Sequence, residues 1–224
     1  MIEKDIIPTD DNKRIEEILK LSWRILKTRF IKGRYVISRE APFQHYFAHI
    51  ISTIGDTFCT KRGEIFMVDL EEKLEGKNNN DEVTKNYIDI TCGFSSGGKE
   101  PKKKTAIELK FKTEEQGAQN LVKINVFRDI KRLENAKKNE KSFVNGRFYM
   151  ITDYKVYVNE SKTGVGTVFT THDGAETQAN KLLHYPDLKS IEDVKFSLDS
   201  SYTFNWEKIV SDKMGDWYFL ELKV

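Results

Sequence analysis

The spacing of the apolar residues changes abruptly in the middle of the chain. Three short stretches, 64–70, 87–94 and 105–112, have the length and apolar content of β-strands, and in the third the apolar residues alternate with a period of two. From 114 to 138 the period becomes about 3.6, which predicts a long helix. The aromatic segment 147–158 then predicts a buried strand. We therefore expect an antiparallel meander, a helix and another strand, combined in a mixed sheet flanked by helices.

Two helices are expected before the meander. Apolar residues recur at helical spacing over about 13–32, after Asp10 or Asp11, either of which can cap the helix. A second helix is expected from 39 to 54, with Ser38 as its cap. Beyond the central part, the sequence predicts one more helix and three short strands: Ala175 to Leu183, then 194–198, 202–206 and 217–224.

Length and composition exclude several classes of protein. A chain of 224 residues suits one domain, and 38% hydrophobic with 12% aromatic residues supplies a packed core, which excludes intrinsic disorder and a collagen-like fibre. No secretory signal or membrane span is visible, so we expect a cytoplasmic protein without a membrane partner. Cys59 and Cys92 are isolated, so we interpret them as buried apolar side chains rather than a disulfide framework or zinc cluster.

The charge of the chain is unevenly distributed. The whole chain has 37 basic and 35 acidic residues, whereas residues 97–147 hold 14 and 7. This segment is either a solvated lysine-rich surface or a binding surface for a polyanion. Charge alone favours the first interpretation.

Charged residues interrupt two of the predicted strands. In the third strand Ile107, Leu109 and Phe111 alternate with Glu108, Lys110 and Lys112, so the charged side chains share one face. In the second strand Asp89 interrupts an apolar run. If the two strands pair, Asp89 can face Glu108 and Lys110 across the sheet.

Such a group has the chemistry of phosphodiester hydrolysis. Two convergent carboxylates repel each other unless a cation lies between them, and their hard oxygen atoms suit Mg²⁺ or Mn²⁺. A metal ion of this kind polarises a phosphoryl oxygen and lowers the pKa of a bound water. A nearby lysine can orient or deprotonate that water and offset charge in the transition state.

The Glu-x-Lys pattern carries weight only in its context. It recurs elsewhere, and Glu221 with Lys223 also lies in an apolar strand, but no helix follows that strand. Only Glu108 combines an apolar strand, an upstream aspartate, a following helix and the basic segment.

These residues resemble the motif of the PD-(D/E)XK nuclease superfamily, to which many type II restriction endonucleases belong. The resemblance rests on Asp89 within YIDIT, on Glu108-Leu109-Lys110 within AIELKFK, and on the following helix with RDIKRLE. The proline that precedes the family's aspartate is Ile88 here. The resemblance implies that Asp89, Glu108 and the Leu109 carbonyl bind the metal, and that Lys110 handles the water.

The resemblance also implies a fold. It is a restriction-endonuclease-like core of the α/β (α+β) class, with a central mixed sheet flanked by helices. One nuclease domain would span residues 1–224, with a helical N-terminal part (1–60), a catalytic core (about 38–158) and a strand-rich C-terminal extension (159–224).

Three further groups of residues have open or simpler interpretations. Many such nucleases add an acidic residue from the helix before the meander; Glu40 is the candidate, with Gln44 on the same face, although an acid there also complements the helix dipole. Both interpretations stay open. We interpret Asp129 and Arg132 as an ion pair on the long helix, and His45 with His49 as packing or helix-face residues.

The leading hypothesis is a Mg²⁺-dependent or Mn²⁺-dependent endonuclease that cleaves double-stranded DNA, as a type II restriction or related defence enzyme. A palindromic target would favour a homodimer. The alternatives are a catalytically inactive nucleic-acid-binding module on the same fold, and a structural protein in which the strand charges only form ion pairs. We expect six basic residues to contact DNA phosphates: Lys102, Lys103, Lys104, Lys112, Lys123 and Arg128.

Overall fold

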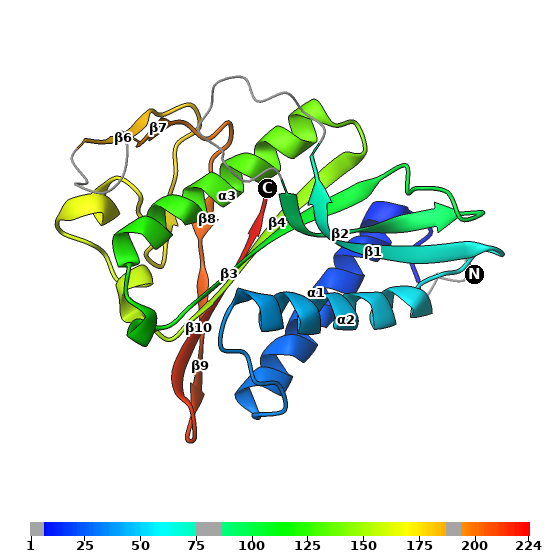
Figure 1. Ribbon diagram of the computed structural model, residues 1–224, viewed down its shortest axis with the longest axis horizontal. Coiled ribbons are helices and arrows are strands. Elements are labelled where there is room, and N and C mark those ends of the chain that lie inside the picture. Colours follow the sequence, from blue (N-terminus) through cyan, green and yellow to red (C-terminus); the bar gives the residue numbers. More distant parts are fainter. Residues whose placement is uncertain (1–6, 75–86, 187–193) are drawn as a thin grey trace, which may run out of the picture.

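A six-stranded sheet separates one long helix from two others in the computed structural model (Figure 1). The structure describes residues 7–74, 87–186 and 194–224; the polar link expected between the first two strands, 75–86, lies outside them. The helices are α1 (Asp11–Ile31), α2 (Glu40–Thr57) and α3 (Gln119–Asn139). Helices α1 and α2 cover one face of the sheet, and α3 covers the other.

The sheet has the order β1-β2-β3-β4-β10-β9. Strands β1, β2 and β3 form the expected antiparallel meander, and β4 pairs parallel to β3 after the crossover through α3. Strands β10 and β9 then continue the sheet with antiparallel pairing. The strand bounds are Glu64–Lys73 (β1), Tyr87–Ser96 (β2), Lys104–Lys112 (β3), Phe143–Thr152 (β4), Trp206–Ser211 (β9) and Gly215–Lys223 (β10). The mixed α/β architecture with flanking helices is therefore confirmed.

Shorter elements surround this sheet. Strands β5 (Ala175–Glu176) and β8 (Thr203–Phe204) pair with each other, as do β6 (Leu183–Tyr185) and β7 (Val194–Phe196). Three short 3₁₀ helices are η1 (Glu114–Gln116), η2 (Lys155–Tyr157) and η3 (Gly164–Thr167).

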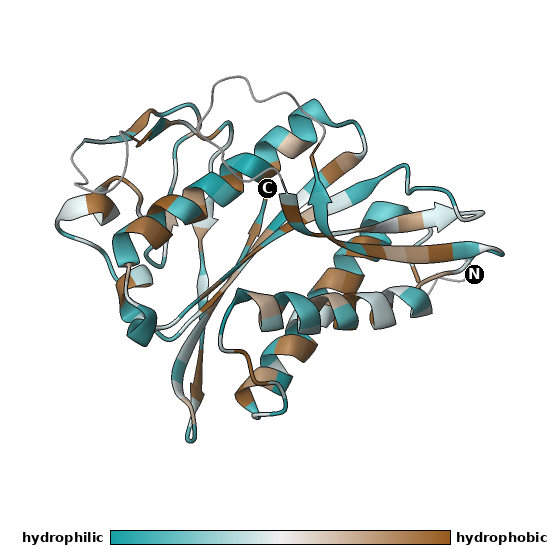
Figure 2. Cartoon of the chain, viewed as in Figure 1, coloured by the Kyte–Doolittle hydropathy of each residue, from teal (hydrophilic) through white to brown (hydrophobic). Residues whose placement is uncertain are grey.

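The helix faces follow the apolar spacing of the sequence. Along α1 the apolar residues at helical spacing are buried, namely Ile15, Ile18, Leu19, Leu26 and Phe30. The Asp10 carboxylate accepts a hydrogen bond from the Lys13 N–H, as a capping residue does. On α3 the expected core residues Ile124, Ile130 and Leu133 are buried, whereas Leu121 is 39% exposed. Figure 2 shows the resulting alternation of apolar and polar residues along the helices.

Two predictions about element ends were wrong. Helix α2 begins at Glu40, so Arg39 and not Ser38 is its cap residue; the Ser38 carbonyl instead accepts a hydrogen bond from Gln116. Strand β4 ends at Thr152 rather than 158, because the Thr152 hydroxyl accepts the Tyr154 N–H and turns the chain. Segment 155–157 then forms η2.

The helix expected at 175–183 does not form. The Thr177 and Asn180 N–H groups donate to the carbonyls of Tyr202 and Leu198, so the backbone bonds of this segment cross to a neighbouring segment instead of running along a helix. Asn180 also has a φ of 59°, which no α-helix contains.

The sheet has an apolar core on each face. On the side of α1 and α2, Trp23 packs against Phe43 and Tyr149. On the side of α3, Phe127 packs against Phe169 and Phe204. The aromatic residues of the C-terminal part complete these cores, as expected. Cys92 is buried and Cys59 is half-buried. In the part of the chain that the structure describes, no helix is both long and apolar enough to cross a membrane.

A buried ion pair connects α1 with β1, the edge strand of the sheet. The Arg14 side chain is fully buried, and both of its terminal nitrogens lie 2.8 Å from carboxylate oxygens of Glu64 on β1. The guanidinium also covers the Phe94 ring at 3.8 Å. The hydrogen bonds from Arg14 lower the pKa of Glu64 from 4.5 to about 2.

The Arg14–Glu64 pair predicts a pH dependence of stability. Because the folded pKa of Glu64 is depressed, its contribution is complete above about pH 5 and is lost as the pH falls toward 2. At pH 7, Glu64→Gln should lower the free energy of unfolding by about 3 kcal/mol. It should also flatten the acid limb, as measured by urea unfolding between pH 7 and pH 2.5.

The exposed carboxylate of Glu17 on α1 provides the control. Glu17→Gln should change neither the midpoint at pH 7 nor the shape of the acid limb. An unchanged acid limb in Glu64→Gln would contradict the prediction.

Candidate active site

Asp89 lies where β2 leaves β3. The two strands pair from Cys92 opposite Thr105 to Ile90 opposite Ile107, and the pairing ends there. One residue further, the Asp89 carboxylate accepts the backbone N–H of Leu109 at 2.7 Å. A side chain thus takes the place of the next main-chain bond and holds the carboxylate beside Glu108 and Lys110.

The backbone of β2 is irregular at this point. Ile88 packs in the core on the α3 side and Ile90 in the core on the α1 and α2 side, although residues two apart in a regular strand share a face. On β1, Glu71 has a φ of 54° and lies between Leu70, which pairs with Ile90, and Glu72, which pairs with Ile88. Gln44 of α2 joins the two strands here, because its amide donates to the Asp89 carbonyl at 2.7 Å and to the Glu71 carboxylate at 2.9 Å.

Glu108 and Lys110 meet α3 on the other side of the sheet plane. The Lys110 ammonium lies 2.9 Å from Asp129 and 3.2 Å from Glu40. Asp129 also bonds Arg132 at 2.9 Å, and Arg132 bonds Glu108 at 2.7 Å. Negative and positive groups therefore alternate along one connected chain. We call this set of five residues, Glu40, Lys110, Asp129, Arg132 and Glu108, the charge network.

The charge network sets the protonation state of its lysine. Burial lowers the pKa of Lys110, but the carboxylates of Asp129, Glu40 and Asp89 outweigh this effect and raise the pKa above its usual value. The pKa of Arg132 is raised in the same way: burial opposes the charge, and Glu108 and Asp129 outweigh it. Lys110 is therefore an ammonium ion, which can orient a water or stabilise negative charge but cannot take a proton.

The charge network opens to solvent at one end. A cleft of about 410 Å³ lies between the start of α2, the end of β3 and the first turns of α3. We call it the Lys110 cleft. Glu40, whose side chain is 50% exposed, and Lys110 face it, whereas the Glu108 side chain is only 1% exposed behind them. Its other lining residues are Arg39, Ala41, Phe111, Lys112, Gln116, Val122 and Asn125.

Some of the predicted site residues are in direct contact, and others are connected only through further residues. Lys110 contacts Glu40 directly and is connected to Glu108 through Asp129 and Arg132, whereas Asp89 is bonded to the Leu109 backbone between Glu108 and Lys110. Gln44 reaches the same place from α2. Sequence reasoning interpreted Asp129 and Arg132 only as an ion pair; that pair exists, but it also holds Lys110 and Glu108. The i, i+3 spacing of Asp129 and Arg132, in the helix directly after the motif, was the sequence signal for their contact with Lys110 and Glu108.

The six predicted DNA-contacting residues divide into different surroundings. Lys112 lines the Lys110 cleft, and Arg128 donates to Asn125 of the same helix. Lys102 and Lys103 are exposed in the loop between β2 and β3. Lys104 is engaged in ion pairs with Glu72 and Glu100, and Lys123 is buried beside Ser161. His45 and His49 are exposed on α2.

Carboxylate and carbonyl oxygens, such as those of Asp89 and its neighbours on β3, are the ligand type that a hard divalent cation prefers. Within the described ranges no group of three or more His, Cys, Asp or Glu side chains is placed to hold a metal ion. Mg²⁺ needs fewer, because it retains several waters and is commonly bound through one or two carboxylates. The expected ligands Asp89, Glu108 and the Leu109 carbonyl include two carboxylates and are therefore of this type.

Comparison with known proteins gives no further identification. No protein-family model matches the chain, and neither a curated protein nor a solved structure matches it significantly.

The geometry predicts that Arg132 is essential for stability. Arg132→Met would leave the buried carboxylates of Glu108 and Asp129 without this cation, so the free energy of unfolding should fall by about 3–5 kcal/mol. Arg128→Met, one turn earlier on α3, should cost less than about 1 kcal/mol. Guanidinium unfolding of both variants checks this.

A double variant tests the cause. Glu108→Gln combined with Arg132→Met removes one of the two carboxylates that lose Arg132 and should recover part of the loss. Strictly additive losses would argue against the ion pair.

Proposed function

We propose that this protein is a divalent-metal-dependent endonuclease that hydrolyses phosphodiester bonds of double-stranded DNA, as a restriction or related defence enzyme. The observation that carries the proposal is the position of Asp89. Its carboxylate is fixed to the Leu109 N–H at the point where β2 and β3 diverge, between Glu108 and Lys110. The order of helix, three antiparallel strands, helix and parallel strand agrees with the core expected for the PD-(D/E)XK superfamily.

The proposed metal, Mg²⁺ or Mn²⁺, would be held by Asp89, Glu108 and the Leu109 carbonyl. When bound, it would polarise a phosphoryl oxygen and lower the pKa of a bound water. Arg132 bonds one oxygen of Glu108, and the Leu109 N–H bonds one oxygen of Asp89, so both carboxylates have a fixed orientation. Pre-set ligands of this kind lower the reorganisation that binding requires.

Lys110 and Glu40 would act on the reacting atoms from the cleft. Water attacks phosphorus, one new P–O bond forms, and the ester P–O bond to the leaving oxygen breaks. Lys110 is an ammonium ion, so it would stabilise the negative charge that develops on the phosphate. Glu40 is the most exposed carboxylate of the charge network and lies 3.2 Å from Lys110, which makes it the group best placed to accept the proton of the water.

A catalytically inactive nucleic-acid-binding module on the same fold is the second candidate. The charge network supports it, because Lys110 and Glu108 already have protein partners of opposite charge. Such a module would bind nucleic acid in a salt-dependent manner without any requirement for a divalent metal.

Cleavage assays separate the two candidates. The wild-type protein should cut plasmid and linear DNA with Mg²⁺ or Mn²⁺ and not with EDTA. Asp89→Asn and Lys110→Met should each lower the rate by about 100-fold or more. The matched controls Asp69→Asn on β1 and Lys138→Met on α3 change exposed side chains and should cut at the wild-type rate. Salt-sensitive DNA binding without cleavage under any metal would favour the inactive module.

The role of Glu40 has its own signature. Glu40→Gln should lower the cleavage rate by about 100-fold, because the cleft loses its proton acceptor, and should leave DNA affinity within about twofold. The pH–rate profile should also lose its acidic limb. A profile that keeps this limb in Glu40→Gln would show that Glu40 is not the base.

A further inference from the structure

A second pocket lies at the beginning of α3, separate from the Lys110 cleft. It has a volume of about 340 Å³ and is formed by the first turns of α3 and the segment from Val156 to Gly166. We call it the α3 pocket. Its lining includes Gln119, Asn120, Lys123, Ser161, Thr163 and Gly166.

Within the described part of the chain, Lys123 is a buried cation without an anionic partner. The residue is only 3% exposed, and its ammonium donates to the Ser161 hydroxyl at 2.7 Å. Among the described residues the Ser161 hydroxyl is its hydrogen-bond acceptor and no carboxylate forms an ion pair with it, which leaves two of its three N–H bonds for a ligand. Burial accordingly lowers its pKa. A buried ammonium in this state is costly unless a ligand supplies the missing acceptors.

Gly166 makes room for this arrangement. A Cβ atom on residue 166 would lie 2.3 Å from the Ser161 hydroxyl oxygen and 2.7 Å from the Lys123 nitrogen. Both distances are far below contact, so any larger side chain would displace the two groups. The close approach of backbone, hydroxyl and ammonium therefore depends on glycine at this position.

The start of α3 adds backbone donors to the same pocket. The cap residue Ala118 makes no side-chain hydrogen bond to the helix, and Gln119 and Asn120, the first two residues of α3, line the pocket. The first N–H groups of an α-helix have no partner within the helix, and together with the helix dipole they favour an anion at this end of the 21-residue α3. At the rim, Glu160 and Lys162 offset each other, which leaves the positive charge of Lys123 inside.

We propose that the α3 pocket binds a phosphate group through Lys123, Ser161 and the first N–H groups of α3. Phosphate fits because it offers several acceptor oxygens and negative charge, and the pocket offers an ammonium, hydroxyls and backbone donors. We further assign this phosphate to the backbone of the DNA substrate. This assignment rests on the proposed function.

The position of the pocket relative to the Lys110 cleft supports that source. Val122 and Asn125 line the cleft, whereas Gln119, Asn120 and Lys123 line the pocket. With about 3.6 residues per turn, these two sets occupy different sides of the same two turns of α3. The openings are therefore about one helix diameter apart, roughly 10 Å. One strand of nucleic acid can reach both.

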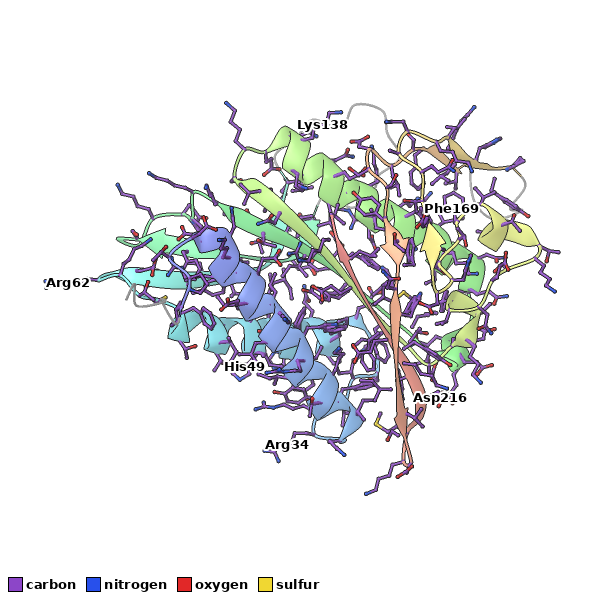
Figure 3. The ribbon with its side chains drawn as sticks, turned by 180° about the vertical axis from the view of Figure 1, so that it is seen from behind. Arg34, His49, Arg62, Lys138, Phe169 and Asp216 are labelled. Carbon is purple, nitrogen blue, oxygen red and sulfur yellow. The ribbon has the colours of Figure 1, made fainter. Side chains whose placement is uncertain are left out.

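Phosphate binding is tested by thermal unfolding in EDTA, without DNA. Inorganic phosphate and deoxyadenosine monophosphate, titrated into wild-type protein, should raise Tm by about 3 °C at roughly ten times the Kd. Lys123→Met should lose this rise. Lys138→Met, which removes the same charge at the opposite end of α3 (Figure 3), should retain it.

The ligand-free Tm excludes a merely structural role for the lysine. Because Lys123→Met removes a buried charge without a counter-charge, the variant should be at least as stable as wild type when no phosphate is present. A wild-type Tm that does not respond to phosphate, an equal response in Lys123→Met, or a ligand-free Tm of Lys123→Met well below wild type would each overturn the proposal.

The source of the phosphate is tested by fluorescence anisotropy with a labelled DNA duplex in EDTA. Lys123→Met should weaken binding about fivefold and reduce the slope of log K against log salt concentration by about one, whereas Lys138→Met should do neither. If the phosphate response disappears in Lys123→Met and duplex binding does not change, the ligand is a free phosphate or nucleotide and the assignment to DNA is wrong. Neither measurement involves cleavage, so an inactive protein can pass both tests and an active nuclease can fail them.

Discussion

The candidate site depends on charges buried between the sheet and α3. Placing Glu108, Asp129, Lys110 and Arg132 in an apolar interior is costly, and the cost is offset only because each charge meets an opposite one within 3 Å. An apolar set of similar volume would stabilise the fold as well or better. Retention of such a network at one cleft therefore needs an explanation other than stability, and chemistry at the cleft is the explanation we favour.

Much of this arrangement was predictable from the chain, since strand alternation is a local property. Ile107, Leu109 and Phe111 do fill the core on one face, which forces Glu108 and Lys110 onto the other. The helix faces followed from apolar spacing for the same reason. The irregularity of β2 at Asp89 was not predictable, because the backbone there is held by Gln44, which is distant in sequence and also bonds Glu71. The failed helix at 175–183 has the same cause: its backbone donors are claimed by residues about twenty positions away.

The basic segment shows how composition can mislead about a surface. Of the cations in 97–147, Lys104, Lys110, Lys131 and Arg132 are engaged in ion pairs inside the protein, and Lys123 is buried. The excess charge is therefore only partly a surface property. Counts of charged residues cannot separate surface cations from cations in internal ion pairs, because partners such as Glu72 and Asp199 lie outside the segment.

The place of β10 in the sheet has a consequence for synthesis of the protein. Residues 215–223 form the fifth of six strands and pair with β4, about seventy positions earlier, and also with β9. Until residues 215–223 have been synthesised, one edge of β4 has no partner, and the aromatic side chains around it remain exposed to water. The nascent chain can thus acquire its motif early but can close its sheet only late, a delay typical of pairings between distant segments.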